Sequence, residues 1–99
     1  MTHKKAVLLF HKKFEYTDGE IVEVKAWSVA PSTAKPEGIK YSFVYIGKDG
    51  TRILGYDNAE GKGHHKHLGG LELPSEFISI EGLVERFTQE VAHLRRRMT

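Results

Sequence analysis

Apolar and polar residues alternate in four segments of the first 57 residues, and this alternation restricts the fold more than any other feature. A period of two is expected of a half-buried β-strand, because successive side chains point to opposite faces of a sheet. The four segments are residues 6–16, 20–29, 39–47 and 51–57. In the first of them the run AVLLF is apolar on both faces, which predicts a strand in the centre of the sheet.

Turn residues separate these segments. Asp18-Gly19 lies between the first and second, and Asp49-Gly50 lies between the third and fourth. Glycine supplies the positive backbone dihedral angle that tight hairpin turns need. Residues 30–38 contain two prolines and a glycine and predict a surface loop. The simplest arrangement of two hairpins is a four-stranded antiparallel meander.

Near the end of the chain the period changes from two to steps of three and four, which predicts one apolar stripe of an amphipathic helix. The stripe consists of Ile80, Leu83, Val84, Phe87, Val91 and Leu94. Ser79 is the expected N-cap, and Glu81 falls in the first turn, where the helix dipole favours a negative charge. We therefore expect an α+β fold: a four-stranded or slightly larger antiparallel meander sheet with one C-terminal helix packed on it.

Length and composition limit the class of protein. At 99 residues, with 39% hydrophobic and 28% charged residues, the chain is expected to form a single folded domain over residues 1–99. It has no cysteine, which excludes disulfides, thiolate zinc sites and thiol nucleophiles, and fits a reducing compartment. The apolar run near the N-terminus is too short for a signal peptide or a membrane span. These observations predict a cytoplasmic protein without a membrane partner.

Basic residues gather in three places along a chain whose net charge is only +2. They are Lys4, Lys5, Lys12 and Lys13 near the start, Lys62 and Lys66 in the middle, and Arg95, Arg96 and Arg97 at the end. Between residues 72 and 90 acidic residues predominate. Such a two-sided charge suits a polyanion, and it is also compatible with an ordinary solvated surface.

Most of the residues that could perform chemistry lie in one segment, YDNAEGKGHHKHLGG, at residues 56–70. Its polar residues follow a predicted strand, and its glycines allow close backbone approach to a phosphate. The candidate catalytic residues are Asp57, Lys62, His65 and His67. The candidate substrate-binding residues are Tyr56, Asn58, Gly61, Gly63 and Lys66.

Three interpretations of this segment remain open from the residues alone. In the first, one histidine takes a proton from a ribose 2′-hydroxyl, the other protonates the leaving oxygen, and Lys62 stabilises the phosphoryl charge without a metal. That chemistry requires RNA. In the second, the pair His65 and His67, with Asp57 or His64, binds a metal that keeps one position for water. In the third, the segment is a flexible solvated loop without a chemical role.

Three stretches of the chain, LLFHKKFEYTDGEIVEVKAWSV, KYSFVYI and YDNAEGKGHHKH, resemble the TumE-like family of toxin components from toxin–antitoxin modules. In the last stretch the matching positions are Tyr56, Asp57, Asn58, Gly61, Lys62, Gly63, His65 and His67. The resemblance implies a growth-inhibiting toxin that a partner antitoxin neutralises, commonly a helix-turn-helix DNA-binding protein.

Together, the residues and the resemblance predict the toxin of a type II module that cleaves RNA without a metal or other cofactor. The alternative is a non-catalytic nucleic-acid-binding or regulatory module, in which the same lysines and histidines only bind phosphate.

Overall fold

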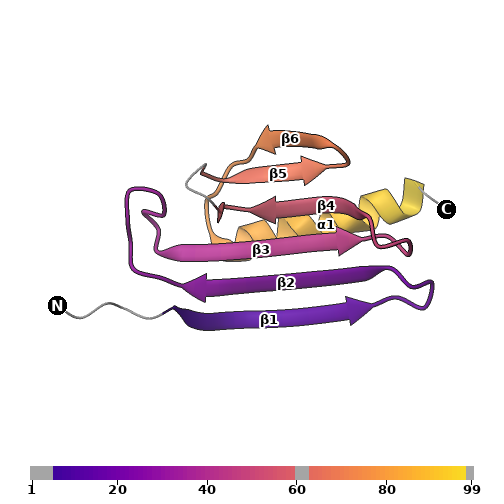
Figure 1. The fold of residues 1–99 in the computed structure, drawn as a ribbon, viewed down its shortest axis with the longest axis horizontal. Helices are drawn as coiled ribbons and strands as arrows, with labels where there is room; N and C mark the ends of the chain where they lie inside the picture. The colour runs from indigo at the N-terminus through magenta and orange to yellow at the C-terminus, as the bar shows by residue number, and fades with distance from the viewer. Residues whose placement is uncertain (1–5, 60–62, 98–99) are drawn as a thin grey trace.

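The computed structural model describes residues 6–59 and 63–97 of the protein. In this part of the chain six strands precede one helix (Figure 1). They are β1 (Val7–Glu15), β2 (Ile21–Ser28), β3 (Ile39–Ile46), β4 (Arg52–Asp57), β5 (His65–Leu68), β6 (Leu71–Pro74) and α1 (Ile80–Arg97). The strands are antiparallel neighbours in chain order, from β1 at one edge to β6 at the other. The predicted α+β meander is confirmed, with a sheet slightly larger than four strands.

The first additional strand, β5, comes from the histidine-rich segment at residues 56–70, and the second, β6, follows that segment directly. β5 pairs with β4, so that Asp57 is opposite His65 and Tyr56 is opposite Lys66. Gly69, with a backbone φ of 59°, turns the chain into β6. Of the three open interpretations, the third, a flexible solvated loop, is therefore wrong for residues 65–68. Histidine and lysine alternate there with a period of two, but their polarity hides the strand pattern.

Strand β1 lies at an edge of the sheet, so the prediction that its apolar first half is central is wrong. Val7, Leu8 and Leu9 are each about half exposed, at 55%, 53% and 48%. An apolar run on both faces usually marks a buried strand. Here the described residues cover neither the outer edge of β1 nor all of its surface.

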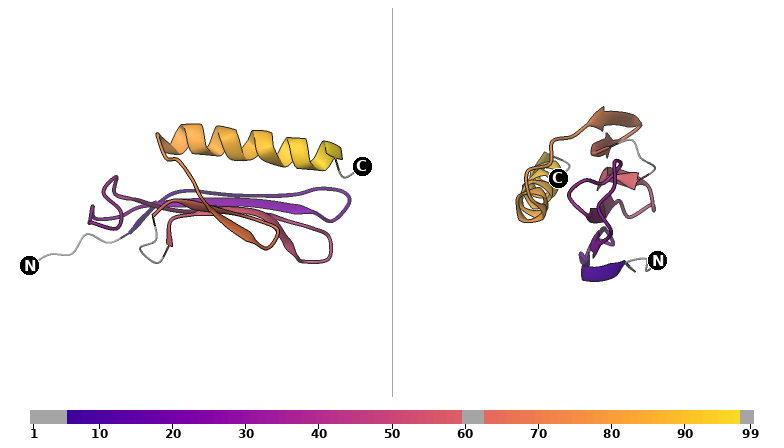
Figure 2. Two further views of the ribbon diagram at one scale, coloured as in Figure 1. Left: turned by 90° about the horizontal axis from the view of Figure 1, so that it is seen from above. Right: turned by 90° about the vertical axis from the view of Figure 1, so that its left-hand side faces the viewer.

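Helix α1 packs on one face of the sheet (Figure 2). The Phe87 ring lies between those of Phe43 and Tyr56, with centroid distances of 5.6 and 5.3 Å. The expected N-cap is confirmed, because the Ser79 hydroxyl accepts a hydrogen bond from the backbone N–H of Gly82 at 3.0 Å. We call the sheet face under α1 the helix face and the opposite one the open face. No helix in the described residues is long and apolar enough to span a membrane.

The C-terminal end of α1 is fixed to the β1–β2 turn by Arg95. Its guanidinium stacks 3.6 Å from the centre of the Tyr16 ring, bonds Glu20 and lies 3.3 Å from Asp18 Oδ2. The buried Glu20 also accepts a hydrogen bond from the Tyr45 hydroxyl at 2.8 Å. The Arg95 side chain, which the sequence groups with a polyanion-binding patch, is thus engaged within the fold.

Candidate functional site

Asp57, His65 and His67 form a cluster on the open face. The strand register places Asp57 opposite His65 and Gly55 opposite His67, so the three side chains project to the same side. His65 Nε2 lies 2.8 Å from Asp57 Oδ1, and His67 Nε2 lies 3.4 Å from Asp57 Oδ2. The centroids of the two imidazole rings are 5.0 Å apart, and the ring planes are nearly perpendicular. The carboxylate therefore lies between the two histidines and orients both.

The two histidines differ in their hydrogen bonds. His65 Nδ1 lies 3.1 Å from the Gly63 carbonyl oxygen, which can only accept a hydrogen bond. Because Nε2 faces the Asp57 carboxylate, both ring nitrogens of His65 have acceptors, and a doubly protonated ring satisfies both. Among the described residues only Nε2 of His67 has a partner. Both ring nitrogens of His65 thus face hydrogen-bond acceptors, whereas Nδ1 of His67 has no partner among the described residues.

The same three residues could hold a metal ion, since their ligand atoms all lie within 4.8 Å of one another. In that arrangement His65 would keep its Nδ1 proton for Gly63 and turn its Nε2 lone pair to the ion. Ligand atoms at tetrahedral positions, with bonds of about 2.0–2.1 Å, are about 3.3 Å apart. The 2.8 Å separation of His65 and Asp57 is shorter and matches a charge-assisted hydrogen bond.

A hollow of about 350 Å³ opens beside His65. Its lining consists of His64, His65, Glu72, Leu73 and Pro74. Glu72 Oε1 lies 3.8 Å from His65 Nε2, so a carboxylate borders the entrance. The volume is at the lower end of the range for small-molecule sites and is large enough for part of a nucleotide.

Cationic and aromatic side chains share the open face with the cluster. Lys25 pairs with Ser42, which pairs with Asp57, so these three residues form one row across the sheet. Trp27 pairs with Lys40, whose ammonium lies 5.7 Å from the centre of the indole ring. Lys25, Trp27 and Lys40 were not among the candidate site residues. The period of two already places Lys25 with Trp27 and Lys40 with Ser42, and the strand register puts both pairs on one face.

Arg52 also reaches this face beside the cluster. A Cβ added at Gly55 would lie 3.0 Å from Arg52 Cδ, so the arginine side chain covers the bare backbone at that position. Gly55 is the partner of His67 in the neighbouring strand. Arg52 therefore brings a positive charge close to His67, and only the sheet register reveals this.

Two candidate substrate-binding residues lie on the other side of the sheet. The Tyr56 hydroxyl donates a hydrogen bond to Glu90 of α1, and Lys66 Nζ lies 3.0 Å from the other oxygen of the same carboxylate. Burial, and then the hydrogen bond to Glu90, raise the pKa of Tyr56 to about 12. Tyr56 and Lys66 thus hold α1 against β4 and β5, and the structure does not bring them to the Asp57 cluster.

The remaining candidates have separate positions. The buried Asn58 accepts a hydrogen bond from the Tyr41 backbone N–H at 3.1 Å and donates one to the Ile39 carbonyl at 2.7 Å. Gly63 has a φ of 76° and supplies the carbonyl that bonds His65. Gly61 and Lys62 lie outside the described residues.

His64 belongs to a different environment from its neighbour His65. Its ring stacks on Phe77 at 4.6 Å and on Tyr41 at 5.6 Å. Its Nδ1 lies 2.7 Å from the Tyr41 hydroxyl, and its Nε2 lies 3.1 Å from Glu37 Oε1. Of the two possible third metal ligands, the structure brings Asp57, and not His64, to the histidine pair.

The chain was compared with protein families, curated proteins and solved structures. The profile of a family described as Toxin TumE matches residues 2–95. No curated protein and no solved structure matches the chain significantly.

Proposed function

This chain belongs to the TumE toxin family, and from that premise we propose that it arrests growth by cutting RNA at the Asp57 cluster. The observation that carries the proposal is the convergence of two imidazoles on one carboxylate, on a sheet face that the helix of the described residues does not cover. Paired acid and base groups of this kind suit phosphodiester cleavage at neutral pH, because imidazole exchanges protons in that range.

The proposed reaction needs no metal. His67 takes the proton of a ribose 2′-hydroxyl, and the 2′-oxygen attacks the adjacent phosphorus. The bond from phosphorus to the 5′-oxygen breaks, and His65 gives that oxygen a proton. The products are a 2′,3′-cyclic phosphate and a free 5′-hydroxyl. Asp57 holds both rings in orientation, and Lys62, outside the described residues, is proposed to stabilise the extra phosphoryl charge.

The open face supplies the elements needed to hold a single RNA strand. Positive charge from Lys25, Lys40 and Arg52 would contact phosphates, and Trp27 offers an aromatic surface for base stacking. Tyr41 and Tyr45 do not offer this surface, because both are buried on the helix face. We therefore propose that the RNA lies along the row that runs from Lys25 through Ser42 to Asp57 and His65.

The toxin family implies an antitoxin. We propose that it is a protein, as in type II modules, with a helix-turn-helix DNA-binding domain, and that the toxin acts in the cytoplasm.

Expression in cells tests this proposal. Without the antitoxin, the wild-type protein should stop growth and leave RNA fragments with 2′,3′-cyclic phosphate ends, and co-expression of the antitoxin should prevent both. His67→Ala should permit growth while the protein accumulates normally. Growth arrest by His67→Ala and His65→Ala variants, without new RNA ends, would contradict the catalytic role and favour a module that only binds nucleic acid.

A further inference from the structure

Helix α1 covers only part of the helix face. Phe87 lies between Phe43 of β3 and Tyr56 of β4, so at this point the helix runs over these two strands. Neighbouring strands are about 4.8 Å apart, which puts β1 roughly 10–14 Å to the side. Packed helices are about 8–10 Å apart. The helix face of β1 therefore lies beside α1 and not under it (Figure 2).

The surface of β1 on this face is mostly apolar. We call Val7, Leu9, Phe10, Lys12 and Phe14 the β1 strip. Four of them pair with helix-face residues of β2, and Leu9 lies at the bulge between Leu8 and Phe10. Val7, Leu9 and Phe14 are 55%, 48% and 59% exposed. A row of large apolar side chains along a sheet edge marks a surface that a partner covers, because isolated proteins rarely expose one.

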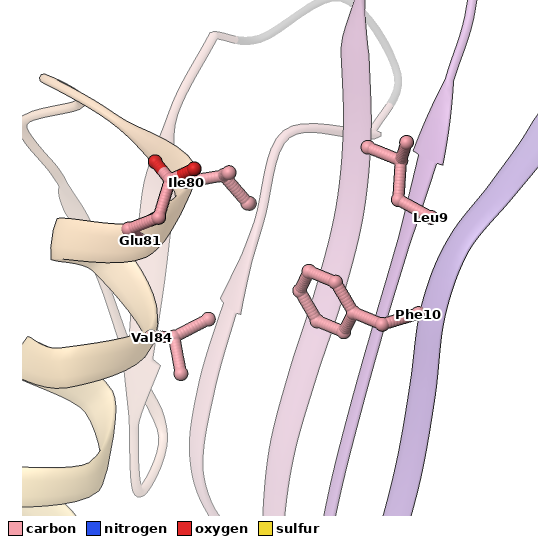
Figure 3. A pocket seen from close by; sticks show the side chains of 5 residues that line it. All are labelled: Leu9, Phe10, Ile80, Glu81 and Val84. Carbon is pink, nitrogen blue, oxygen red and sulfur yellow. The ribbon is translucent and has the colours of Figure 1, made fainter.

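A groove runs between the β1 strip and α1. One hollow of about 440 Å³ lies between Leu9 and Phe10 on one side and Ile80, Glu81 and Val84 on the other (Figure 3). A second hollow, of about 160 Å³, follows along the strand. It is lined by Phe10, Lys12, Val24 and Val84. Because the two hollows share Phe10 and Val84, they form one mostly apolar groove whose lining includes the exposed Lys12.

We propose that this groove binds an amphipathic helix of the antitoxin, with its apolar face on the β1 strip and a carboxylate next to Lys12. The proposal rests on the antitoxin that the toxin family implies, and is independent of RNA cleavage. An apolar groove between a helix and a sheet fits the i, i+3, i+4 stripe of such a helix. The exposed Lys12 requires an acidic partner residue, since an apolar helix would cover its charge without compensation.

A second copy of this chain fits the groove less well. In the described residues α1 is the only helix, and its apolar residues Leu83, Phe87 and Val91 are already buried against its own sheet. A second copy therefore has no described helix to place in the groove. An added strand along the outer edge of β1 would leave the hollow beside Ile80 and Val84 unfilled.

Calorimetric titration tests the proposal, with the purified protein encoded next to the toxin gene used as the antitoxin and titrated into the purified toxin. Leu9→Glu and Phe14→Glu should each weaken binding by about 100-fold, and Lys12→Glu by about tenfold. Leu71→Glu is the matched control, because Leu71 is 62% exposed at the opposite sheet edge, on β6. The affinity of this variant for the antitoxin should stay within about twofold of the wild-type value. Circular dichroism and the urea midpoint establish that each variant is folded. Phe14→Glu should cut RNA like the wild type but escape inhibition by the antitoxin.

Three results would overturn this assignment. The first is unchanged affinity in folded Leu9→Glu and Phe14→Glu variants. The second is protection of the outward-facing β1 amides from hydrogen exchange on binding, which would indicate an added strand. The third is a wild-type homodimer that Phe14→Glu converts to a monomer, which would give the groove to a second copy. Because binding is measured without RNA, a failure of RNA cleavage leaves these results unaffected.

Discussion

Asn58 provides a quantitative test of the fold around the site. Its side chain bonds the backbone N–H of Tyr41 and the carbonyl of Ile39, and the residue is only 1% exposed. Asn58→Ala leaves both backbone groups without these partners. Each unsatisfied buried group costs about 1–3 kcal/mol, and partial solvation of the Ile39 carbonyl lowers the sum. We expect a loss of about 2–4 kcal/mol in the free energy of unfolding, out of a total of roughly 5–15 kcal/mol.

Urea unfolding followed by Trp27 fluorescence measures this loss, since Trp27 is the only tryptophan. The midpoint should fall at an unchanged slope, and the melting temperature should drop by roughly 10–25 °C. Lys48→Ala, in the exposed β3–β4 turn, is the control and should stay within about 0.5 kcal/mol of the wild type. An Asn58→Ala variant that unfolds at the wild-type midpoint but binds RNA more weakly would refute the structural role and return Asn58 to the substrate-binding residues.

Three further predictions concern the helix and its contacts. Ser79→Ala removes the hydrogen bond to Gly82 and should cost about 0.5–2 kcal/mol in urea unfolding; an unchanged midpoint would contradict the N-cap. The pKa of Tyr56 is raised from 10.0 to about 12, so its contribution to stability is complete below pH 10 and is lost as pH rises through 12. The melting temperature of the wild type should therefore fall between pH 10 and pH 12, and that of Tyr56→Phe should fall less steeply. An equally steep fall in both proteins would argue against the raised pKa of Tyr56. Lys66→Ala loses a contact to Glu90 on the helix face and should leave the RNA cleavage rate within about twofold, whereas a large loss would place Lys66 in the site.

The first four strands and the helix could be predicted from sequence because each has a clear period and a defined boundary. Asp18-Gly19 and the Ser79 cap end or begin their elements by local chemistry that does not depend on the rest of the fold. The position of β1 could not be predicted. Leu9 and Phe10 of its apolar run line a groove that is complete only when α1 lies beside the strand.

The site was partly predictable for a related reason. Asp57, His65 and His67 were selected by their chemistry, and the structure brings them together because residues 65–68 form a strand opposite β4. Tyr56 precedes Asp57 in sequence, and Lys66 lies between His65 and His67, so both alternate to the other face. A correct strand assignment for residues 65–68 would have separated the two sets, and histidine content alone does not supply that assignment.

Single-turnover cleavage in the presence of a chelator tests the central claim most directly. The substrate is an RNA cut in cells that express the toxin, compared with the same strand carrying a 2′-deoxy sugar at the cleavage position. We expect the wild type to cut only the RNA, with the chelator present, and His67→Ala and His65→Ala each to lower the rate by about 100-fold or more. Equal cleavage of both strands would exclude attack by the 2′-hydroxyl. Activity that the chelator abolishes and zinc restores would contradict the metal-free mechanism and assign Asp57, His65 and His67 to a metal.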